Sequence, residues 1–302
     1  MKRLIVVYNP RSSRFKDVER EVLSAARELK GYMVGKYEVE PTDVDANAKK
    51  LAKLLHDDDL VISAGGDATG VIAVNGIMMS GKSAKLGVLP YGNFNDLART
   101  LGTSTLDDVT RGEVVKYYPL DIVVDGKHFR YASCYVTMGM TAEAVELFDE
   151  PKFRKKMQKG HKSSWRSYVQ LVKWYFKNRH KKVYIPPFAL NGVKQHPKIS
   201  DYAAMNGTSM CRVMKTKGCY KEKDKFTRLT GRLTSFWRLS ILMMRSIVTC
   251  TPHLSVKGTD LIEFDVPSTV ELQAEGEYRV FRNIKKIEVR KATEYIRMIS
   301  LK

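Results

Sequence analysis

The stretch LVISAGGDATGVIAVNGI, residues 60–77, puts two glycines and an aspartate between an apolar run and residues with helical apolar spacing. Gly65 and Gly66 let the backbone approach a ligand, and the first amides of a following helix favour an anion. Asp67 suits Mg²⁺, which binds through few protein carboxylates and shares phosphate oxygens, and Thr69 adds a hydroxyl. Taken alone, the loop also fits an ordinary strand-to-helix turn with an aspartate cap.

Two further loops carry groups that suit phosphate and a cation. The sequence PYGNFND supplies a glycine, two amides and a carboxylate, from Gly92, Asn93, Asn95 and Asp96. The sequence NPRSSR supplies guanidinium and hydroxyl donors for phosphate oxygens, from Arg11, Ser12, Ser13 and Arg14. The second loop favours a binding cleft over an isolated turn.

The elements around these loops predict how they are positioned. Apolar runs at residues 3–8, about 37–40 and 60–64, and another before Pro90, alternate with residues at helical spacing. Strands that alternate with helices predict a parallel sheet, which places ligand loops at the carboxyl ends of its strands. All three polar loops follow such strand ends.

The pattern changes after Tyr117. Two β-rich runs around Asp125-Gly126 predict a hairpin. Further β-like runs lie at about 183–190, 200–207, 226–230, 260–265 and 269–273. We therefore expect an α/β domain over residues 1–118, rejoined by 291–302, and a mostly antiparallel β domain over 119–290.

Four motifs together resemble the diacylglycerol kinase catalytic-domain family, which also includes sphingosine and ceramide kinases. They are NPRSS, GGDAT, PYGNFND and AEGE, in the family's order, and FRYASCYVTMGMTAEAV resembles the segment that opens the family's second domain. The resemblance implies a two-domain lipid kinase architecture: an α/β N-terminal domain with a parallel Rossmann-like sheet, and a mostly antiparallel β-sandwich. It implies phosphoryl transfer from Mg²⁺-ATP to a lipid hydroxyl, such as that of diacylglycerol.

The resemblance also implies roles for individual residues. Glu277 would accept the proton, helped by Glu275, and Asp67 and Asp96 would organise the metal. A structural Mg²⁺ site would use Lys221, Asp224 and Phe226. The nucleotide contacts would come from Asn9, Pro10, Arg11, Ser12, Ser13, Thr42, Gly65, Gly66, Asp67, Ala68, Thr69, Gly92, Asn93, Asn95 and Asp96.

Several positions depart from the family pattern. Ala68 and Ser13 replace glycines, Asn93 replaces a threonine, and Glu275 replaces an aspartate. These changes leave open a catalytically degenerate member that binds nucleotide or membrane without turnover. A kinase of another acceptor, such as NAD or a sphingoid base, is a further alternative.

Charge indicates an anionic partner. The 302 residues contain 52 Lys plus Arg against 33 Asp plus Glu, and residues 152–182 hold twelve Lys or Arg and no acidic residue. Nucleic acid is one reading, but RNA-recognition and zinc-finger patterns are absent and the carboxylate loops would have no role, so we expect no nucleic acid. We expect a lipid substrate at an anionic membrane surface.

Two helices are expected in the second half. The first carries an aromatic stripe and a basic stripe, and the second, residues 236–250, is apolar but too short to span a bilayer. The aromatic stripe comprises Trp165, Tyr168, Val169, Val172 and Tyr175, and the basic stripe Arg166, Gln170, Lys173 and Lys177. Such a stripe enters lipid headgroups or packs on its own domain. The four cysteines lack the close pairing of a zinc site or a small disulfide scaffold, so we expect reduced thiols in a cytoplasmic protein. The expected lipid substrate places this protein peripherally at the inner face of the membrane. A homodimer stays open.

Overall fold

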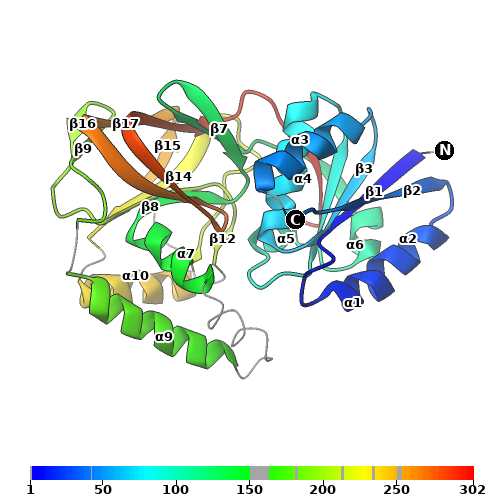
Figure 1. Cartoon of the computed structure of the whole chain (residues 1–302), viewed down its shortest axis with the longest axis horizontal. Helices are drawn as coiled ribbons and strands as arrows, with labels where there is room; N and C mark the ends of the chain where they lie inside the picture. Colours follow the sequence, from blue (N-terminus) through cyan, green and yellow to red (C-terminus); the bar gives the residue numbers. More distant parts are fainter. Residues whose placement is uncertain are drawn as a thin grey trace.

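The computed structural model describes residues 2–41, 43–149, 163–180, 183–211, 214–232, 235–249 and 254–302, which form two lobes (Figure 1). The N-terminal lobe contains a six-stranded sheet. Its order is β2 (Tyr32–Glu38), β1 (Lys2–Tyr8), β3 (Leu60–Gly65), β4 (Lys85–Pro90), β18 (Ile296–Ser300) and β5 (Glu113–Tyr117). The first five strands run parallel, and β5 is antiparallel to β18.

Apolar side chains cover both faces of this sheet. Along β1, Leu4 and Val6 belong to one core cluster, and Ile5 and Val7 belong to the other. Successive side chains of a strand point to opposite faces, so a continuous apolar run is what a sheet covered on both sides requires. The helices of the lobe are α1 (Phe15–Val18), η1 (Glu19–Leu23), α2 (Ser24–Glu28), α3 (Val44–Leu54), α4 (Asp67–Ser80), α5 (Asp96–Leu101) and α6 (Leu106–Arg111).

Local signals set the helix ends in this lobe. The side chain of Asp43 accepts a hydrogen bond from the backbone N of Ala46 (2.6 Å) and caps α3. Gly81, with a φ of 63°, ends α4. At α6, Thr105 and Asp108 form a capping box.

The C-terminal lobe contains a ten-stranded antiparallel sheet around one apolar core. Asp125 and Gly126, with φ values of 46° and 78°, form the turn of the predicted hairpin. The runs at 260–265 and 269–273 belong to one bulged strand, β16. The strands are β6 (Leu120–Val124), β7 (Lys127–Ala132), β8 (Tyr135–Gly139), β9 (Phe188–Leu190), β10 (Val193–Lys194), β11 (Asp201–Met205), β14 (Lys225–Gly231), β15 (Leu254–Lys257), β16 (Thr259–Ala274) and β17 (Glu277–Lys291). The predicted fold class, an α/β lobe followed by an antiparallel β lobe, is confirmed.

The described residues of this lobe also form the helices α7 (Met140–Asp149), α9 (Ser163–Asn178) and α10 (Phe236–Thr249). The predicted aromatic stripe on α9 is divided, because Tyr175 is buried against Met140 and Tyr184 whereas Val172 is half exposed. The side chains of residues 163–168, 170 and 171, and most of the basic segment 152–182, lie outside the described residues. In the described part of the chain, no helix is both long and apolar enough to cross a bilayer.

Candidate active site

The loops after β3 and β4 touch through their glycines. The two strands are neighbours, and Gly65 pairs with Pro90 at their carboxyl ends. A Cβ on Gly92 would lie 2.2 Å from the Cα of Gly66. A Cβ on Gly65 would lie 2.3 Å from Oγ1 of Thr69. Because only glycine permits such approaches, these residues bring the two polar loops into one site.

Asp67 begins α4 and links it to the second loop. Its Oδ1 accepts a hydrogen bond from the backbone N of Asp96 (2.9 Å), and its Oδ2 accepts one from the backbone N of Asn95 (3.2 Å). Burial and the neighbouring Asp96 carboxylate raise the pKa of Asp67 to about 6. A divalent cation beside Asp67 would therefore stabilise its charged form.

Asp96 faces the other lobe. Its side chain is buried, with Oδ1 accepting a hydrogen bond from Oγ of Ser209 (2.6 Å) and Oδ2 accepting one from the backbone N of Cys211 (2.6 Å). These residues lie at a small hairpin formed by β12 (Ser209–Met210) and β13 (Met214–Lys215). Asp96 thus joins the lobes behind the site and acts on Asp67 through its charge. Its role as a metal ligand stays a prediction.

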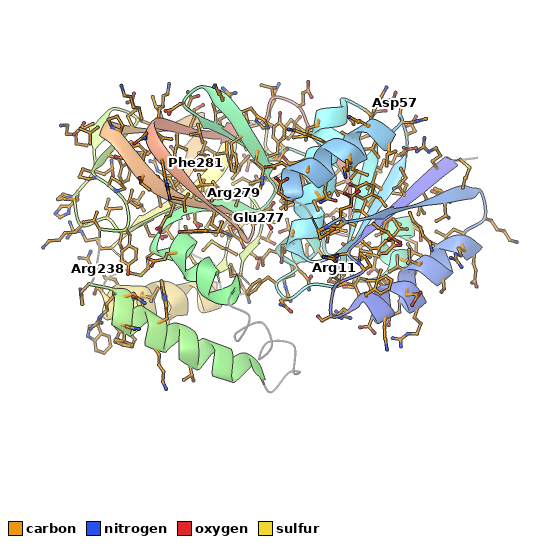
Figure 2. The ribbon with its side chains drawn as sticks, viewed as in Figure 1. Arg11, Asp57, Arg238, Glu277, Arg279 and Phe281 are labelled. Carbon is orange, nitrogen blue, oxygen red and sulfur yellow. The ribbon has the colours of Figure 1, made fainter. Side chains whose placement is uncertain are left out.

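The turn between β16 and β17 brings two glutamates to the same region. Glu275 and Gly276 have φ values of 52° and 90°, the positive angles that a two-residue hairpin turn requires. The backbone N of Cys134 donates to Oε1 of Glu275 (2.5 Å). Burial, and to a smaller extent the charge of Asp67, raise the pKa of Glu275 to about 7. Glu277 begins β17 at the end nearest the N-terminal lobe in Figure 2.

The thiol of Cys134 marks where the carboxylates converge. Burial raises its pKa well above the usual value, and the charges of Glu275, Asp96 and Asp67 add to that effect. Among the described residues, no three His, Cys, Asp or Glu side chains form a ready metal cage.

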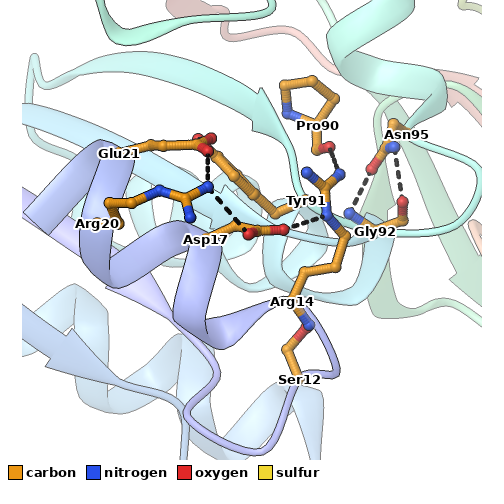
Figure 3. Close-up of polar contacts among 9 residues, drawn as sticks. All are labelled: Ser12, Arg14, Asp17, Arg20, Glu21, Pro90, Tyr91, Gly92 and Asn95. Carbon is orange, nitrogen blue, oxygen red and sulfur yellow. Dashed lines mark hydrogen bonds and ion pairs between the residues drawn. The ribbon is translucent and has the colours of Figure 1, made fainter. Parts of the chain in front are cut away.

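The NPRSSR loop packs beside this site through Arg14 (Figure 3). The guanidinium of Arg14 donates to the backbone O of Pro90 (3.0 Å), pairs with Asp17 (3.1 Å) and lies 5.0 Å from the ring centroid of Tyr91. Asn9 shapes the loop by accepting the backbone N–H of Arg11 (2.9 Å). The charge of Arg14 thus positions the NPRSSR loop against the PYGNFND loop, whereas the side chain of Arg11 is exposed.

Asn95 holds the second loop closed upon itself. Its Oδ1 accepts from the backbone N of Gly92 (2.7 Å), and its Nδ2 donates to the backbone O of Gly92 (2.8 Å) (Figure 3). With a φ of 57°, Asn95 occupies the left-handed region, which asparagine tolerates better than most residues. The predicted contact residue Asn95 therefore shapes the loop, and Asn93 is the exposed amide.

The remaining predicted site residues occupy varied positions. Ala68 lies exposed within α4, so its backbone is helical and needs no glycine conformation, and Thr69 is buried against Gly65. Pro10, Ser12 and Ser13 share the NPRSSR loop, and Thr42 lies outside the described residues.

The second predicted metal site lies away from these loops, near β14. Asp224 is exposed in the turn before that strand, and its backbone O accepts from the N of Gly258 (3.0 Å). Phe226 is fully buried, and Nζ of Lys221 donates to the backbone O of Lys302 (2.9 Å). The structural Mg²⁺ site at these residues stays a prediction.

Sequence reasoning missed the residues that hold the lobes together. Asp45 in α3 receives two hydrogen bonds from the buried guanidinium of Arg130 in β7 (3.0 and 2.7 Å). The side chain of Asn75 in α4 bonds both the backbone N and O of Tyr131 (2.9 Å each). These partners lie 56 or more positions apart, so no local spacing signals them.

Comparison with known proteins identifies the N-terminal lobe. Residues 3–122 match the family model described as the diacylglycerol kinase catalytic domain. For this part of the chain, the match confirms the resemblance that the sequence motifs indicated. The chain is 36% identical over 135 residues to a diacylglycerol kinase of Bacillus subtilis, and 33% identical over 127 residues to one of Staphylococcus carnosus.

These matches cover 43% and 41% of this chain, and 44% and 38% of the two relatives. The diacylglycerol kinases are thus matched over less than half of their length. A structure of a diacylglycerol kinase from Bacillus anthracis str. Sterne has a TM-score of 0.66 at 15% identity, covering 99% of this chain and 97% of that one. That likeness extends the shared fold to both lobes.

Proposed function

We propose that this protein is an ATP-dependent lipid kinase, which transfers the γ-phosphoryl group to a lipid hydroxyl such as that of diacylglycerol. The observation that carries the proposal is the convergence of Asp67 and Glu275. The charge of Asp67, which follows the phosphate-type glycine loop, raises the pKa of Glu275, a second carboxylate that comes from the β lobe. A phosphoryl donor and an acceptor hydroxyl would meet between such groups.

The nucleotide would bind at the glycine loops of the α/β lobe. The first loop leads into the N-terminus of α4, whose first amides favour an anion, and Arg11 supplies an exposed guanidinium nearby. The carboxylate of Asp67 would hold Mg²⁺, and the cation would offset the cost that burial and the charge of Asp96 impose on its ionised form. The bound metal would neutralise charge on the phosphates.

The acceptor hydroxyl would lose its proton to the glutamates of the β16–β17 turn. Glu277 accepts the proton in this proposal, and Glu275 assists with its charge. With a pKa of about 7, Glu275 becomes charged as the pH rises through neutrality, so its assistance to Glu277 depends on pH. Catalysis then rests mainly on positioning and charge.

The division of labour follows the two lobes. We propose that residues 1–118 with 291–302 bind nucleotide and that residues 119–290 bind the lipid, at an anionic membrane surface. Asp96 and Arg130 would keep the two halves of the site in register, because each pairs with the opposite lobe.

The test is transfer of labelled phosphate from ATP into a panel of lipids that includes diacylglycerol, ceramide and a sphingoid base. We expect labelled phosphatidic acid, lost in Asp67→Asn and Glu277→Gln while both variants stay folded by circular dichroism. Asp265→Asn, an exposed carboxylate of β16, is the matched control and should keep full activity. Intact ATP binding with no labelled lipid in any mixture would reject the kinase and favour a degenerate nucleotide-binding member.

A further inference from the structure

Helix α10 presents large apolar side chains to solvent. Trp237, Ile241 and Met244 are 74%, 52% and 65% exposed. Their spacing of four and three residues puts them on one side of the helix. Soluble proteins rarely leave such side chains contiguous and uncovered, so this side of α10 is suited to contact another surface.

The apolar surface continues onto α9, which lies beside α10 along the lower edge of the β lobe in Figure 1. The rings of Phe176 and Phe236 contact each other at 5.1 Å between centroids, and both are exposed. Val172, one turn before Phe176, is also exposed. We call the set Val172, Phe176, Phe236, Trp237, Ile241 and Met244 the α9–α10 face.

Exposed basic side chains lie on the same helices as the α9–α10 face. The guanidinium of Arg179 lies 4.7 Å from the ring centroid of Phe176, and Lys173, Lys177 and Arg238 are exposed on the same two helices. Residues 163–180 and 235–249 contain six Lys or Arg and no Asp or Glu. Two copies of this face would repel each other, whereas an anionic surface would attract it.

We infer that the α9–α10 face docks on an anionic lipid bilayer, with Trp237, Ile241 and Met244 entering the headgroup region. Aromatic and aliphatic side chains on one side of a cationic helix are what interfacial helices use to bind membranes. Each Lys or Arg near an anionic leaflet contributes on the order of 1 kcal/mol, so the basic rim adds to the apolar contact. The inference deepens the proposed function, since docking would bring the acceptor lipid to the β lobe.

Vesicle flotation tests the docking independently of catalysis. The full chain is mixed with vesicles of phosphatidylcholine alone, or of phosphatidylcholine with phosphatidylglycerol. We expect binding only to the anionic vesicles and weaker binding at higher salt. The triple variant Trp237→Ser/Ile241→Ser/Met244→Ser should bind at least about tenfold more weakly. Val193→Ser/Val266→Ser removes two equally exposed apolar residues from the same lobe and should bind like the parent.

Undiminished flotation of the folded triple variant would overturn the docking. The docking would also be overturned if the parent is an oligomer that the triple substitution converts to a monomer, because the face would then be a contact between copies. A kinase assay separates the two proposals. With a water-soluble short-chain diacylglycerol, the triple variant should be as active as the parent, and with vesicle-embedded diacylglycerol it should lose activity. If the parent is inactive on both substrates but the triple substitution still weakens flotation, the kinase proposal is rejected and the docking is retained.

Discussion

A methyl group on Gly92 would lie 2.2 Å from the Cα of Gly66, closer than side-chain carbons come to the backbone of other residues. The loops after β3 and β4 therefore touch backbone to backbone, which fixes the distance between the predicted phosphate-binding amides and Asp67. Any side chain at residue 92 must separate the loops.

Gly92→Ala should weaken both the fold and ATP binding. The added methyl meets backbone, which cannot move aside as a flexible side chain can, so we expect a loss on the order of 1–3 kcal/mol in the free energy of unfolding. Gly70→Ala, within α4, is the matched control. Outside its own helix, the added methyl would contact only Leu97, at an ordinary 3.7 Å. Alanine there should be neutral or stabilising by up to about 1 kcal/mol. Urea titration measures the free energy of unfolding, and calorimetry measures ATP binding. Equal effects of the two variants would refute the close-contact argument.

The pair of Asp45 and Arg130 should couple strongly across the lobes. Arg130 is fully buried and Asp45 accepts two of its hydrogen bonds, so Asp45→Ala leaves a buried charge without its partner. We expect a loss of about 3–5 kcal/mol in unfolding free energy. Arg130→Met should cost less, and the double variant should resemble Arg130→Met. A double-mutant cycle by urea unfolding measures the coupling; additive losses would contradict it.

Much of the fold could be predicted from the sequence because its signals are local. The alternation of apolar strands with helices predicted the parallel sheet, and Asp125-Gly126 predicted the hairpin that opens the β lobe. The single strand β16 was predicted as two, because the bulge at Ser268 interrupts the alternation of apolar residues. The assignment of residues 1–118 and 119–290 to separate functions stays a prediction.

The candidate site could be predicted only in part. Glycines and carboxylates in short motifs indicated the loops, but nothing local shows that Asp96 faces Ser209 or that Glu275 reaches Cys134, since these partners are 113 and 141 positions apart. Ala68 illustrates the opposite case. It replaces a glycine of the family pattern, but it lies within α4, whose helical backbone accommodates alanine.

Glu275 should control how activity depends on pH. Burial raises its pKa to about 7, so its charged form, which would assist the proton transfer, accumulates only as the pH rises through 7. We expect kcat/KM for lipid phosphorylation to rise toward a plateau above pH 7. Glu275→Gln keeps the shape but cannot ionise, and should lower kcat/KM and remove this limb. A pH profile from 5.5 to 9 with saturating Mg²⁺ tests this expectation, and an unchanged limb in the variant would assign it to another group.

Asp201 should make the protein less stable as the pH rises from about 4 to 7. It is buried in β11, and Oδ1 accepts hydrogen bonds from the N (2.9 Å) and Oγ1 (2.6 Å) of Thr141. Burial raises its pKa from 3.8 to about 7, so the folded chain holds a proton that the unfolded chain releases between these values. The stabilisation is full below pH 3.8 and is lost as the pH rises through 7, with a magnitude on the order of 4 kcal/mol.

Asp201→Asn keeps an oxygen to accept both Thr141 hydrogen bonds but cannot ionise. The variant should therefore unfold at higher urea than the parent at pH 8 and at similar urea at pH 4. Asp265→Asn, whose carboxylate is exposed, should leave the pH dependence of the midpoint unchanged. Parallel midpoint curves for the parent and Asp201→Asn would show that Asp201 is charged in the folded protein throughout this range, and that Thr141 and the surrounding sheet stabilise the anion.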